Sequence, residues 1–293
     1  MQSKIKNKIS ALGVISFVIL LLYGISLVIP MLWSLSTSFK DYIDSIVNPL
    51  GRPAKWVNNY SLVLKYFSKP VEYGAATRTV YIPEMIGISL IYAVGGAFIS
   101  TTVAMVAAYV VAKFDFKFCK VIYVIVIVQM IIPIVGSLPS ELRIARALGL
   151  YDSLFGVLVM KTYVTGMYFL IFYSTFKGIP RDYSEAAWMD GASNISVLIR
   201  IMIPMVKGVF GTIMLLCFIS FWNDYQTPMI YMPNHPTLAY GLYYYVNGSY
   251  NPETSSVPLQ LAGCMFMAVP LILLFCIFHK RLLSDVTTGG LKG

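Results

Sequence analysis

The chain of 293 residues is 58% hydrophobic and only 12% charged, and it carries a formal net charge of +9. Soluble domains have about 25% charged residues, so the composition excludes an ordinary soluble domain. The net positive charge would suit a nucleic-acid partner, but the Lys and Arg residues stand at the ends of long apolar runs. Composition therefore predicts an integral membrane protein without a nucleic-acid partner.

Four stretches of the sequence lack Asp, Glu, Lys and Arg and can each hold the ~20 apolar residues that a membrane-spanning helix needs. Two weaker stretches are each interrupted by one charge, Lys161 or Asp224. The first stretch is too long for a signal peptide and lacks a small-residue cleavage site, so we expect it to be retained as a helix. The sequence thus predicts six transmembrane helices, over 10–33, 85–111, 121–137, 153–176, 208–229 and 259–278.

Basic residues cluster at helix ends that share one side of this topology. An excess of Lys and Arg marks cytoplasmic segments, so we expect both termini, the loop 177–206 and the tail 279–293 to be cytoplasmic. The loop 37–84 is then external, and we expect it to form a small cap of short helices. The basic clusters are Lys4, Lys6 and Lys8; Lys113, Lys117 and Lys120; and Lys280 and Arg281.

Small residues recur at every fourth position of the predicted helix 85–111. A stripe of this kind lets helices approach closely in lipid, so we expect this helix to lie inside the bundle; chance richness in Ala is the alternative. The stripe consists of Gly96, Ser100, Ala104, Ala108 and Ala112.

The sequence carries no motif for catalysis or for ATP binding. It has no Gly-Lys dipeptide, and therefore no GxxxxGK[ST] phosphate loop, and it contains neither HExxH nor GxSxG. The cysteines Cys119, Cys217, Cys264 and Cys276 form no CxxC pair, which favours buried thiols over a metal site or a disulfide. We therefore expect no enzyme and no metal or cofactor on this chain.

A polar segment, "EAAWMDGASNISVLIRIMIP" (185–204), separates the fourth and fifth predicted helices. Asp182 and Glu185 have the N-cap and N3 spacing of a helix start, which places acids at the positive end of the helix dipole. Gly191 permits the left-handed turn that ends a helix. The sequence therefore predicts a short helix that stops at Gly191.

A second short helix is predicted after Gly191. Ile195, Leu198, Ile199 and Met202 have the spacing of an apolar helical stripe, and Pro204 is expected to close the helix. Neither helix reaches the ~12–15 residues at which an isolated helix becomes marginal in water. The pair must therefore dock, and the residues alone leave open whether it docks on its own bundle, on the lipid surface or on a second protein.

This segment resembles the cytoplasmic loop of the permeases of binding-protein-dependent ABC importers, with Ile203 where those permeases usually have Leu. Further motifs resemble the carbohydrate branch of that family: "AAYVVAKFDFK" (107–117), "LGLYDS" (148–153), "MDGAS" (189–193) and "FWNDYQTPMIYM" (221–232). The ending "TTGGLKG" (287–293) resembles that of the G-type maltose permease subunit. The likeness covers roughly 59–293 and departs in the first loop and at "KRLLSDV" (280–286). The loop pattern is carried by Glu185, Ala186, Ala187, Gly191, Ile201, Ile203 and Pro204.

The resemblance implies an all-α integral membrane protein, a single permease domain over 1–293 with six transmembrane helices and a cytoplasmic coupling helix. It implies a multi-pass location in a bacterial cytoplasmic membrane. The implied partners are a second, F-like permease subunit, two ATP-binding subunits, an extracytoplasmic solute-binding protein and membrane lipid. ATP and Mg²⁺ would bind on the partner ATPase subunits.

The resemblance also implies which residues contact the ATPase subunits. Glu185 would form a salt bridge or hydrogen bond there, or it would only stabilise the start of its helix. The C-terminal residues Gly289, Gly290 and Lys292 would reach the ATPase subunits, against the alternative of a frayed end. The coupling residues are Glu185, Ala186, Ala187, Asp190, Gly191, Ala192, Ile201 and Pro204.

Polar residues within the predicted helices are candidates for the substrate pathway, because sugars are held by planar polar groups and aromatic faces. For Lys161 the alternative is a side chain that reaches to the outer surface, and for Gln129 it is a hydrogen bond between helices. Asn223 and Asp224 would alternatively touch the binding protein. The candidates are Gln129, Lys161, Tyr163, Tyr168, Asn223, Asp224 and Gln226.

The function best supported by the sequence is that of an ATP-driven ABC importer permease for a sugar or oligosaccharide. An ABC permease for peptides or amino acids is one alternative, since it shares the Glu-Ala-Ala loop. An ion-coupled secondary carrier is the other, with Lys161 and Asp224 as its only ionisable residues within the apolar runs.

Overall fold

A computed structural model describes residues 11–74, 76–132, 136–162, 166–248 and 256–288, and the surroundings of their side chains except at 11–12, 73 and 279–288. The chain divides into two compact units. The smaller unit comprises residues 1–66 and 248–266, and the larger comprises 67–247 and 267–293. Within the described residues, four helices are long and apolar enough to cross a membrane: Gly13–Thr37, Ile82–Lys113, Asn194–Asn223 and Val257–Phe278.

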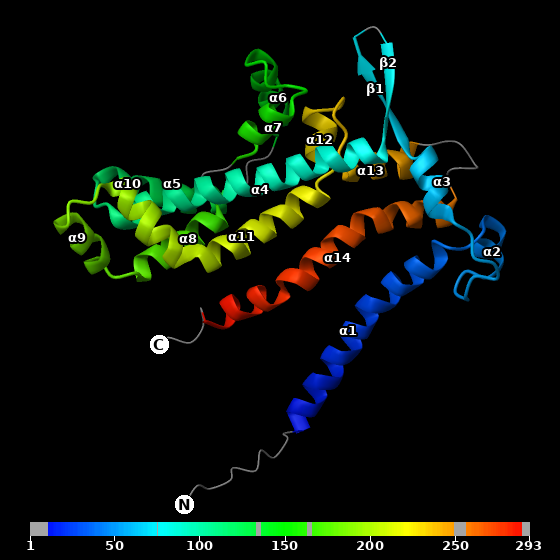
Figure 1. The fold of residues 1–293 in the computed structure, drawn as a ribbon, viewed down its shortest axis with the longest axis horizontal. Coiled ribbons are helices and arrows are strands. Elements are labelled where there is room, and N and C mark those ends of the chain that lie inside the picture. The colour runs from blue at the N-terminus through cyan, green and yellow to red at the C-terminus, as the bar shows by residue number, and fades with distance from the viewer. Residues whose placement is uncertain (1–10, 75, 133–135, 163–165, 249–255, 289–293) are drawn as a thin grey trace, which may run out of the picture. The chain divides into compact units, whose positions relative to one another are not determined.

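The larger unit is built around one long helix, α4 (Ile82–Lys113), which packs against α8 (Met167–Gly178) and α11 (Ile203–Asn223). The ribbon shows α4 and α11 running beside each other over most of their length (Figure 1). A Cβ on Gly96 of α4 would lie 2.9 Å from ring atoms of Phe221 on α11. The predicted small-residue stripe is therefore an internal helix contact: Gly96, Ala104, Ala108 and Ala112 are buried and Ser100 is partly buried.

The core of this unit is aromatic at the end where α4 finishes. Phe169, Phe172 and Phe176 of α8 are fully buried, and Tyr109 of α4 meets Phe176 edge-on with ring centroids 5.5 Å apart. Edge-to-face pairs of this kind add about 0.5–1.5 kcal/mol beyond the area that they bury. The four rings fix α8 against α4, and with it the chain that leaves α8.

Two predicted transmembrane helices differ from the structure. The helix expected over 121–137 is α5 (Lys117–Ile131), which starts earlier and ends earlier, and residues 133–135 lie outside the described residues. The helix expected over 153–176 is two helices, α7 (Leu154–Met160) and α8, with Lys161 at the C-cap of α7. The helix α7 ends at the charged residue that interrupts the apolar run, because there the lysine side chain contacts acidic and aromatic partners outside the helix.

The predicted fifth helix, 208–229, also has different limits. The chain is helical without a break from Asn194 to Asn223, through α10 (Asn194–Val197), the π-helix η1 (Leu198–Met202) and α11. Residues expected near its end form a separate helix, α12 (Gln226–Tyr231). Pro204 therefore does not close a short helix but stands in the first turn of α11.

The π-helix explains how Pro204 is tolerated. The N–H of Ile203 bonds to the carbonyl of Leu198, five residues back. A proline inside a regular α-helix clashes with the carbonyl four residues before it, and a wider π-turn at this point relieves that clash. The wider turn also shifts the helix faces, so Met202 is buried whereas Ile195 and Ile199 of the predicted stripe are exposed.

At the opposite end of α4 the chain forms a hairpin that the sequence did not predict. Strand β1 (Ser68–Tyr73) pairs antiparallel with β2 (Ala76–Tyr81), which leads directly into α4 (Figure 1). Lys69 of β1 is buried, donates to the carbonyl of Pro233 at 3.1 Å and lies over the ring of Tyr240, 4.7 Å from its centroid. Burial lowers the pKa of Lys69 below its ordinary value.

The same end of the larger unit holds α6 (Leu138–Ala147), α7, α12 and α13 (Leu238–Gly248). Asp152, which has a positive φ of 55°, accepts hydrogen bonds from the backbone and side-chain amides of Asn234 at 3.0 and 2.8 Å. Its own N–H donates to the carbonyl of Tyr231 at 2.8 Å. These bonds tie the α6–α7 connection to the α12–α13 connection.

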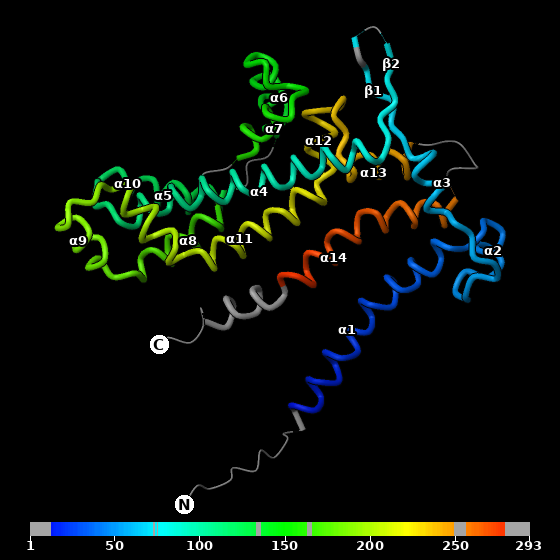
Figure 2. The backbone as a smooth tube through the Cα atoms, viewed as in Figure 1, coloured from blue at the N-terminus to red at the C-terminus, as the bar shows by residue number. Residues whose placement is uncertain are grey.

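The smaller unit contains α1 (Ala11–Thr37), the short helices α2 (Tyr42–Val47) and α3 (Asn59–Tyr66), and the start of α14 (Val257–Thr288). The predicted cap of short helices is thus present in 37–66, where buried Lys40 donates to the carbonyls of Asn48 and Pro49 at 2.6 and 3.1 Å. Helix α14 extends past the predicted limit of 278, so part of the expected tail is helical. The backbone tube shows α1 leading into α2 and α3 (Figure 2).

The cysteines follow the prediction only in part. None of the four, all of which lie in the described part of the chain, forms a disulfide; Cys119 and Cys217 are buried and Cys264 is partly buried. Cys276 is exposed, because it lies on a face of α14 that no other part of the described chain covers. An apolar run therefore predicts a membrane helix without predicting which of its sides is buried by protein.

Candidate functional site

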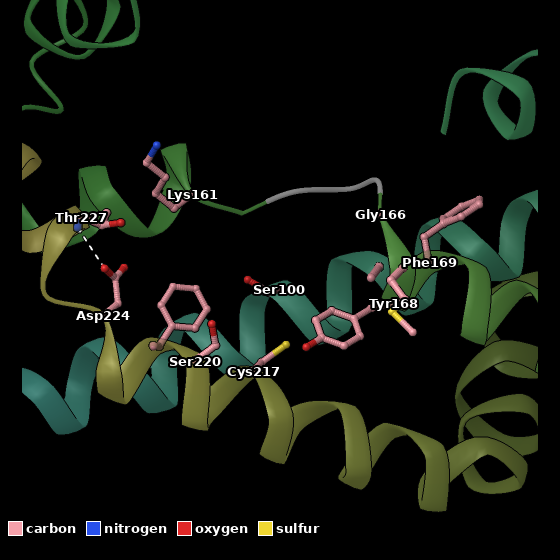
Figure 3. Close-up of a pocket in the computed structure, with 12 residues that line it drawn as sticks. Ser100, Lys161, Gly166, Tyr168, Phe169, Cys217, Ser220, Asp224 and Thr227 are labelled. Atoms are coloured by element: carbon pink, nitrogen blue, oxygen red, sulfur yellow. Dashed lines mark hydrogen bonds between the residues drawn. The ribbon is translucent and has the colours of Figure 1, made fainter. Parts of the chain in front are cut away.

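A cavity of about 530 Å³ lies among α4, α7, α8, α11 and α12 in the larger unit. This volume falls in the range of ~300–1,000 Å³ that is typical of small-molecule sites. Figure 3 shows Ser100, Ser220 and Asp224 around this space, with the amine of Lys161 and the ring of Phe169 pointing away from them. The polar lining residues are Ser100, Lys161, Tyr168, Ser220, Asp224 and Thr227.

Aromatic rings supply much of the remaining wall. Phe169 and Phe221 line the cavity together with Tyr168. Phe221 is held edge-on by Tyr92, with ring centroids 5.1 Å apart and an interplanar angle of 89°. Hydroxyl and charged groups beside aromatic faces are suited to a solute that has both polar edges and apolar faces.

Lys161 lines the cavity and is held by an acidic partner on α6. Its Nζ donates to Oε2 of Glu141 at 2.7 Å and to the hydroxyl of Tyr231 at 3.2 Å. The Tyr231 hydroxyl also donates to Glu141, and Ser137 donates to the other carboxylate oxygen at 2.7 Å. The Lys161 side chain is 14% exposed, so it is a mostly covered cation that is paired with the acid of α6.

Asp224 is the second charged residue of the lining. It is the C-cap of α11, and its Oδ1 accepts the backbone N–H of Thr227 at 3.0 Å (Figure 3). Its Oδ2 accepts the hydroxyl of Tyr92 at 2.9 Å. Because Tyr92 is buried on α4, this pair of bonds connects the end of α11 to the central helix.

The Glu141 cluster should make the protein sensitive to acid. The hydrogen bonds from Lys161, Tyr231 and Ser137 lower the pKa of Glu141 from 4.5 to about 2. Because the pKa is lower in the folded state, the stabilisation is complete above the ordinary pKa of 4.5 and is lost as the pH falls toward 2. We therefore expect Glu141→Gln to lower the melting temperature at pH 7, and this difference from the unchanged protein to shrink below pH 4.5.

Thermal unfolding of both proteins between pH 7 and pH 3 measures this difference. Glu84 provides the matched control, because it pairs with Arg78 at 2.7 Å but at an exposed position. Exposed pairs contribute only about 0–1 kcal/mol, so Glu84→Gln should change little. A melting-temperature difference for Glu141→Gln that stays constant down to pH 3 would contradict the assigned role of this cluster.

The structure brings together some of the predicted substrate-pathway residues and separates others. Lys161, Asp224 and Tyr168 all line the cavity. Asn223 is exposed and donates to the carbonyl of Ile219 at 2.9 Å. Gln129 on α5 and Gln226 on α12 are exposed and are not among the lining residues, and Tyr163 lies outside the described residues.

Sequence reasoning missed Ser100, Ser220 and Thr227 in the lining. Ser220 and Asp224 are four residues apart and therefore share one helix face, which was an available signal. Ser100 belongs to the small-residue stripe and was interpreted as packing alone. Within the described part of the chain, no group of three His, Cys, Asp or Glu side chains is placed to hold a metal ion.

A second feature lies at the end of the bundle where α4 finishes: helix α9 (Asp182–Met189) and the turn after it. The predicted short helix is confirmed, but its start differs by one residue, because Arg181 is the N-cap and Asp182 stands in the first turn. Gly191 has φ +81°. The N–H of Ala192 bonds to the carbonyl of Ala187 at 2.9 Å and that of Gly191 to Trp188 at 3.0 Å, which is the Schellman pattern of a left-handed helix end.

Helix α9 is attached to the bundle on one side and exposed on the other. Lys113 at the end of α4 donates to the carbonyl of Ile179 at 2.6 Å, and Arg181 pairs with Asp115 at 2.7 Å. Ala187 and Ala192 pack against the core of the larger unit. Three large side chains of α9 are exposed, Tyr183, Trp188 and Met189, of which Met189 is 89% exposed.

The predicted coupling residues thus divide between these two sides. Glu185, Ala186, Asp190 and Gly191 are exposed, and so is Pro204. Ala187, Ala192 and Ile201 are partly buried against the core. The predicted tail residues Gly289, Gly290 and Lys292 lie outside the described residues.

The fold and these two features define a membrane-embedded transport subunit, with a cavity among apolar helices and an exposed helix at one end of the bundle. The chain belongs to the family of binding-protein-dependent transport system inner membrane components, which its residues 100–286 match. Subunits of this family are transport components of ABC importers and not enzymes, so the predicted family is confirmed. A permease of this kind acts with a permease partner, ATPase subunits and a binding protein.

Three curated relatives illustrate the likeness. The arabinooligosaccharides transport system permease protein AraQ of Bacillus subtilis is 28% identical over 240 residues, covering 80% of this chain and 76% of the relative. The diacetylchitobiose uptake system permease protein NgcG of Streptomyces coelicolor is 25% identical, covering 95% and 88%. The trehalose/maltose transport system permease protein MalG of Thermococcus litoralis is 26% identical, covering 93% and 94%.

A solved structure shares the fold. A chain in the crystal structure of a bacterial ABC transporter involved in the import of the acidic polysaccharide alginate superposes with a TM-score of 0.78. The match covers 95% of this chain and 99% of that chain at 21% sequence identity. The ABC importer permease fold predicted from the sequence is therefore confirmed, with the β1–β2 hairpin as an addition to an otherwise helical architecture.

Proposed function

We propose that this chain is one half of the translocation pore of an ATP-driven importer of a sugar or oligosaccharide. It pairs with a second, F-like permease subunit. Two ATPase subunits bind ATP and Mg²⁺ on the cytoplasmic side, and an extracytoplasmic binding protein delivers the solute. The chain itself holds no cofactor, and it transmits movement between the ATPase subunits and the solute pathway.

The saccharide substrate is supported by the relatives and by the chemistry of the cavity. The three relatives are permeases for arabinooligosaccharides, diacetylchitobiose and trehalose or maltose. The cavity combines hydroxyl-bearing side chains with the rings of Tyr168, Phe169 and Phe221. Sugars present hydroxyl groups at their edges and C–H groups on their faces, so this lining matches both surfaces of a sugar ring.

We assign coupling to the ATPase subunits to the loop 177–206. The observation that supports this assignment is the exposure of helix α9. This helix of eight residues is too short to be stable alone. Ser184 and Ala187 face the bundle, whereas the large side chains Tyr183, Trp188 and Met189 are exposed and Met189 points away from the bundle. A helix that presents apolar side chains away from its own bundle is suited to insertion into a groove of a second protein.

The orientation follows from the end of the bundle at which α9 lies. Lys113, Lys117 and Lys120 lie at this same end, where α4 finishes and α5 begins. Basic residues favour the cytoplasmic side of a bacterial plasma membrane, so α9 and both chain termini are cytoplasmic in the proposed topology. The hairpin and helices α6, α7, α12 and α13 are then on the external side.

Reconstitution of the chain with its partner permease, ATPase subunits and binding protein tests this function. In proteoliposomes we expect saccharide uptake that requires ATP and stops when the ATP site of the ATPase subunit is inactivated by mutation. Uptake that persists with the inactive ATPase would instead support an ion-coupled carrier.

A site-specific photo-cross-linker at Met189 tests the coupling contact in the same complex. We expect cross-linking to an ATPase subunit at Met189 and none at Leu50, which is similarly exposed at 84% but lies in the predicted external cap. No cross-link from Met189 to an ATPase subunit would refute the assigned role of α9.

A further inference from the structure

The charges that line the cavity are compensated. The lining carries one cation, Lys161, and one anion, Asp224, among the described residues. Lys161 is in addition paired with Glu141, which stands behind it on α6 and is not part of the lining. The cavity therefore has no surplus positive charge with which to attract an acidic solute.

The Lys161 ammonium is masked on the side away from the cavity. Glu141 accepts from its Nζ at 2.7 Å, and the ammonium lies 4.3 Å from the ring centroid of Tyr231. The lowered pKa of Glu141, to about 2, keeps its carboxylate ionised at neutral pH. Removal of this one carboxylate would take away the anion with which the ammonium is paired beside the cavity.

An unpaired hydroxyl is present in the same cavity. The Oγ of Ser100 is buried and has no hydrogen-bond partner in the described structure, although Ser100 lines the cavity. A buried hydroxyl without a partner costs free energy, and this oxygen becomes available to a solute hydroxyl only when the side chains around it move aside. Figure 3 shows this oxygen on α4, on the side facing Lys161 and Tyr168.

We propose that the cavity takes an uncharged sugar unit and disfavours an acidic one, and that Glu141 sets this preference by neutralising Lys161. This inference rests on the proposed function, because it names the substrate class of the same pathway. Glu141 acts as a positioning and charge-masking residue, whereas Lys161 and Asp224 supply the two charges of the cavity wall.

Charged thiol reagents measure the electrostatic potential of the cavity without requiring transport. Ser220 is exposed and lines the cavity, so Ser220→Cys, in an assembled complex whose four native cysteines are replaced, reports the local potential. We compare its reaction rates with an anionic and a cationic methanethiosulfonate. Fields in clefts change local ion concentrations by ~10-fold or more, so Glu141→Gln should raise the anionic-to-cationic rate ratio by about tenfold.

Two controls isolate the effect of Glu141. Glu84→Gln removes the same charge from an exposed pair and should leave the ratio unchanged. Lys161→Gln should lower the ratio, and combining it with Glu141→Gln should return the ratio to its original value. If Glu141→Gln folds poorly, a lower anionic-to-cationic rate ratio in Lys161→Gln still tests whether the charge of Lys161 contributes to the potential of the cavity. An unchanged ratio in both single variants would overturn the proposal.

Protection of the Ser220→Cys thiol by saccharides tests the substrate class. The probes are maltotriose, xylotriose and mannotriose as neutral sugars, and trigalacturonate and triguluronate as acidic ones. We expect a neutral probe to slow the reaction and the acidic probes to do so only after Glu141→Gln. Stronger protection by an acidic probe in the unchanged protein, or protection by none of the five, would overturn the proposal. If uptake proves independent of ATP while the rate ratio still shifts, the proposed function fails and the charge mask stands.

Discussion

Gly156→Ala, which adds a single methyl group in the α6–α7 region, is expected to destabilise the protein strongly. Gly156 lies in the first turn of α7, and a Cβ there would overlap the backbone carbonyl oxygen of Leu150. The backbone of Leu150 cannot easily move, because its N–H bonds to the carbonyl of Ala145 at 2.8 Å. We expect a loss of about 3 kcal/mol, at the upper end of the usual cost of overpacking.

Gly211→Ala is the matched control for this substitution. Gly211 is also helical, in α11, but a Cβ at this position would meet nothing within 4 Å. Replacing an unconstrained helical Gly by Ala gains roughly 0.5–1 kcal/mol. Thermal unfolding of the assembled complex should therefore give a clearly lower melting temperature for Gly156→Ala and an equal or slightly higher one for Gly211→Ala. Equal melting temperatures for the two variants would contradict the close approach of α7 to Leu150.

This packing matters for function because the α6–α7 region carries Glu141 and Lys161 to the cavity. The connection between the two helices is held by Asp152, through its hydrogen bonds to Asn234 and Tyr231. A shift of α7 would move Lys161, which stands at its C-cap. We therefore attribute the close packing at Gly156 to the positioning of this lysine relative to Asp224.

The apolar spans could be predicted from the sequence, but their continuity could not. Runs without charge identified α1, α4, α5 and α14, because lipid demands about 20 apolar residues whatever their order. The run 153–176, which one charge interrupts, is divided into α7 and α8. The mean hydropathy of a long segment is little changed by one lysine. It therefore does not reveal that a helix ends at Lys161, whose amine bonds to Glu141 and Tyr231.

The hairpin and the π-helix were missed for different reasons. The segment "ATRTVY" of β2 has the β-branched residues of a strand and follows a Gly with φ +62°. The sequence therefore contains a signal for a strand, although a cap of short helices is predicted there. The sequence contains no comparable signal for the π-helix η1. A proline after an amphipathic stripe usually ends a helix, and only tertiary packing of Val197, Met202 and Val206 into the core kept the helix continuous.

Of the candidate site, the charged residues were predictable and the hydroxyl groups were not. An ionisable residue in an apolar run is costly, so Lys161 and Asp224 were conspicuous, and both line the cavity. Ser and Thr are common in any membrane helix, and only Ser220, which stands four residues before Asp224, had a signal in the sequence; nothing separated Ser100 or Thr227 from a packed hydroxyl. The turn at Gly191 was predictable, because its chemistry depends on backbone geometry alone.

Gly191→Val is expected to lower saccharide uptake strongly while leaving the protein inserted in the membrane. Gly191 has φ +81°, in open space, so the substitution causes backbone strain and no clash. A β-branched residue in this left-handed conformation costs about 1–3 kcal/mol. That strain competes with the two hydrogen bonds by which Gly191 and Ala192 end α9, and the contact of Ala187 and Ala192 with the core is lost with them.

Since 1.4 kcal/mol corresponds to a factor of ten in an equilibrium constant, we expect ATP-dependent uptake by Gly191→Val to fall about tenfold or more. Gly191→Asn is the control, because Asn adopts the left-handed conformation far more readily than Val; it should retain most of the uptake. Both variants should reach the membrane in equal amounts, because the strained residue lies outside the candidate membrane spans. The cross-link from Met189 to the ATPase subunit should weaken only in Gly191→Val. Normal uptake by that variant would mean that the geometry of this turn does not transmit force, and α9 would then be a connector and not a coupling helix.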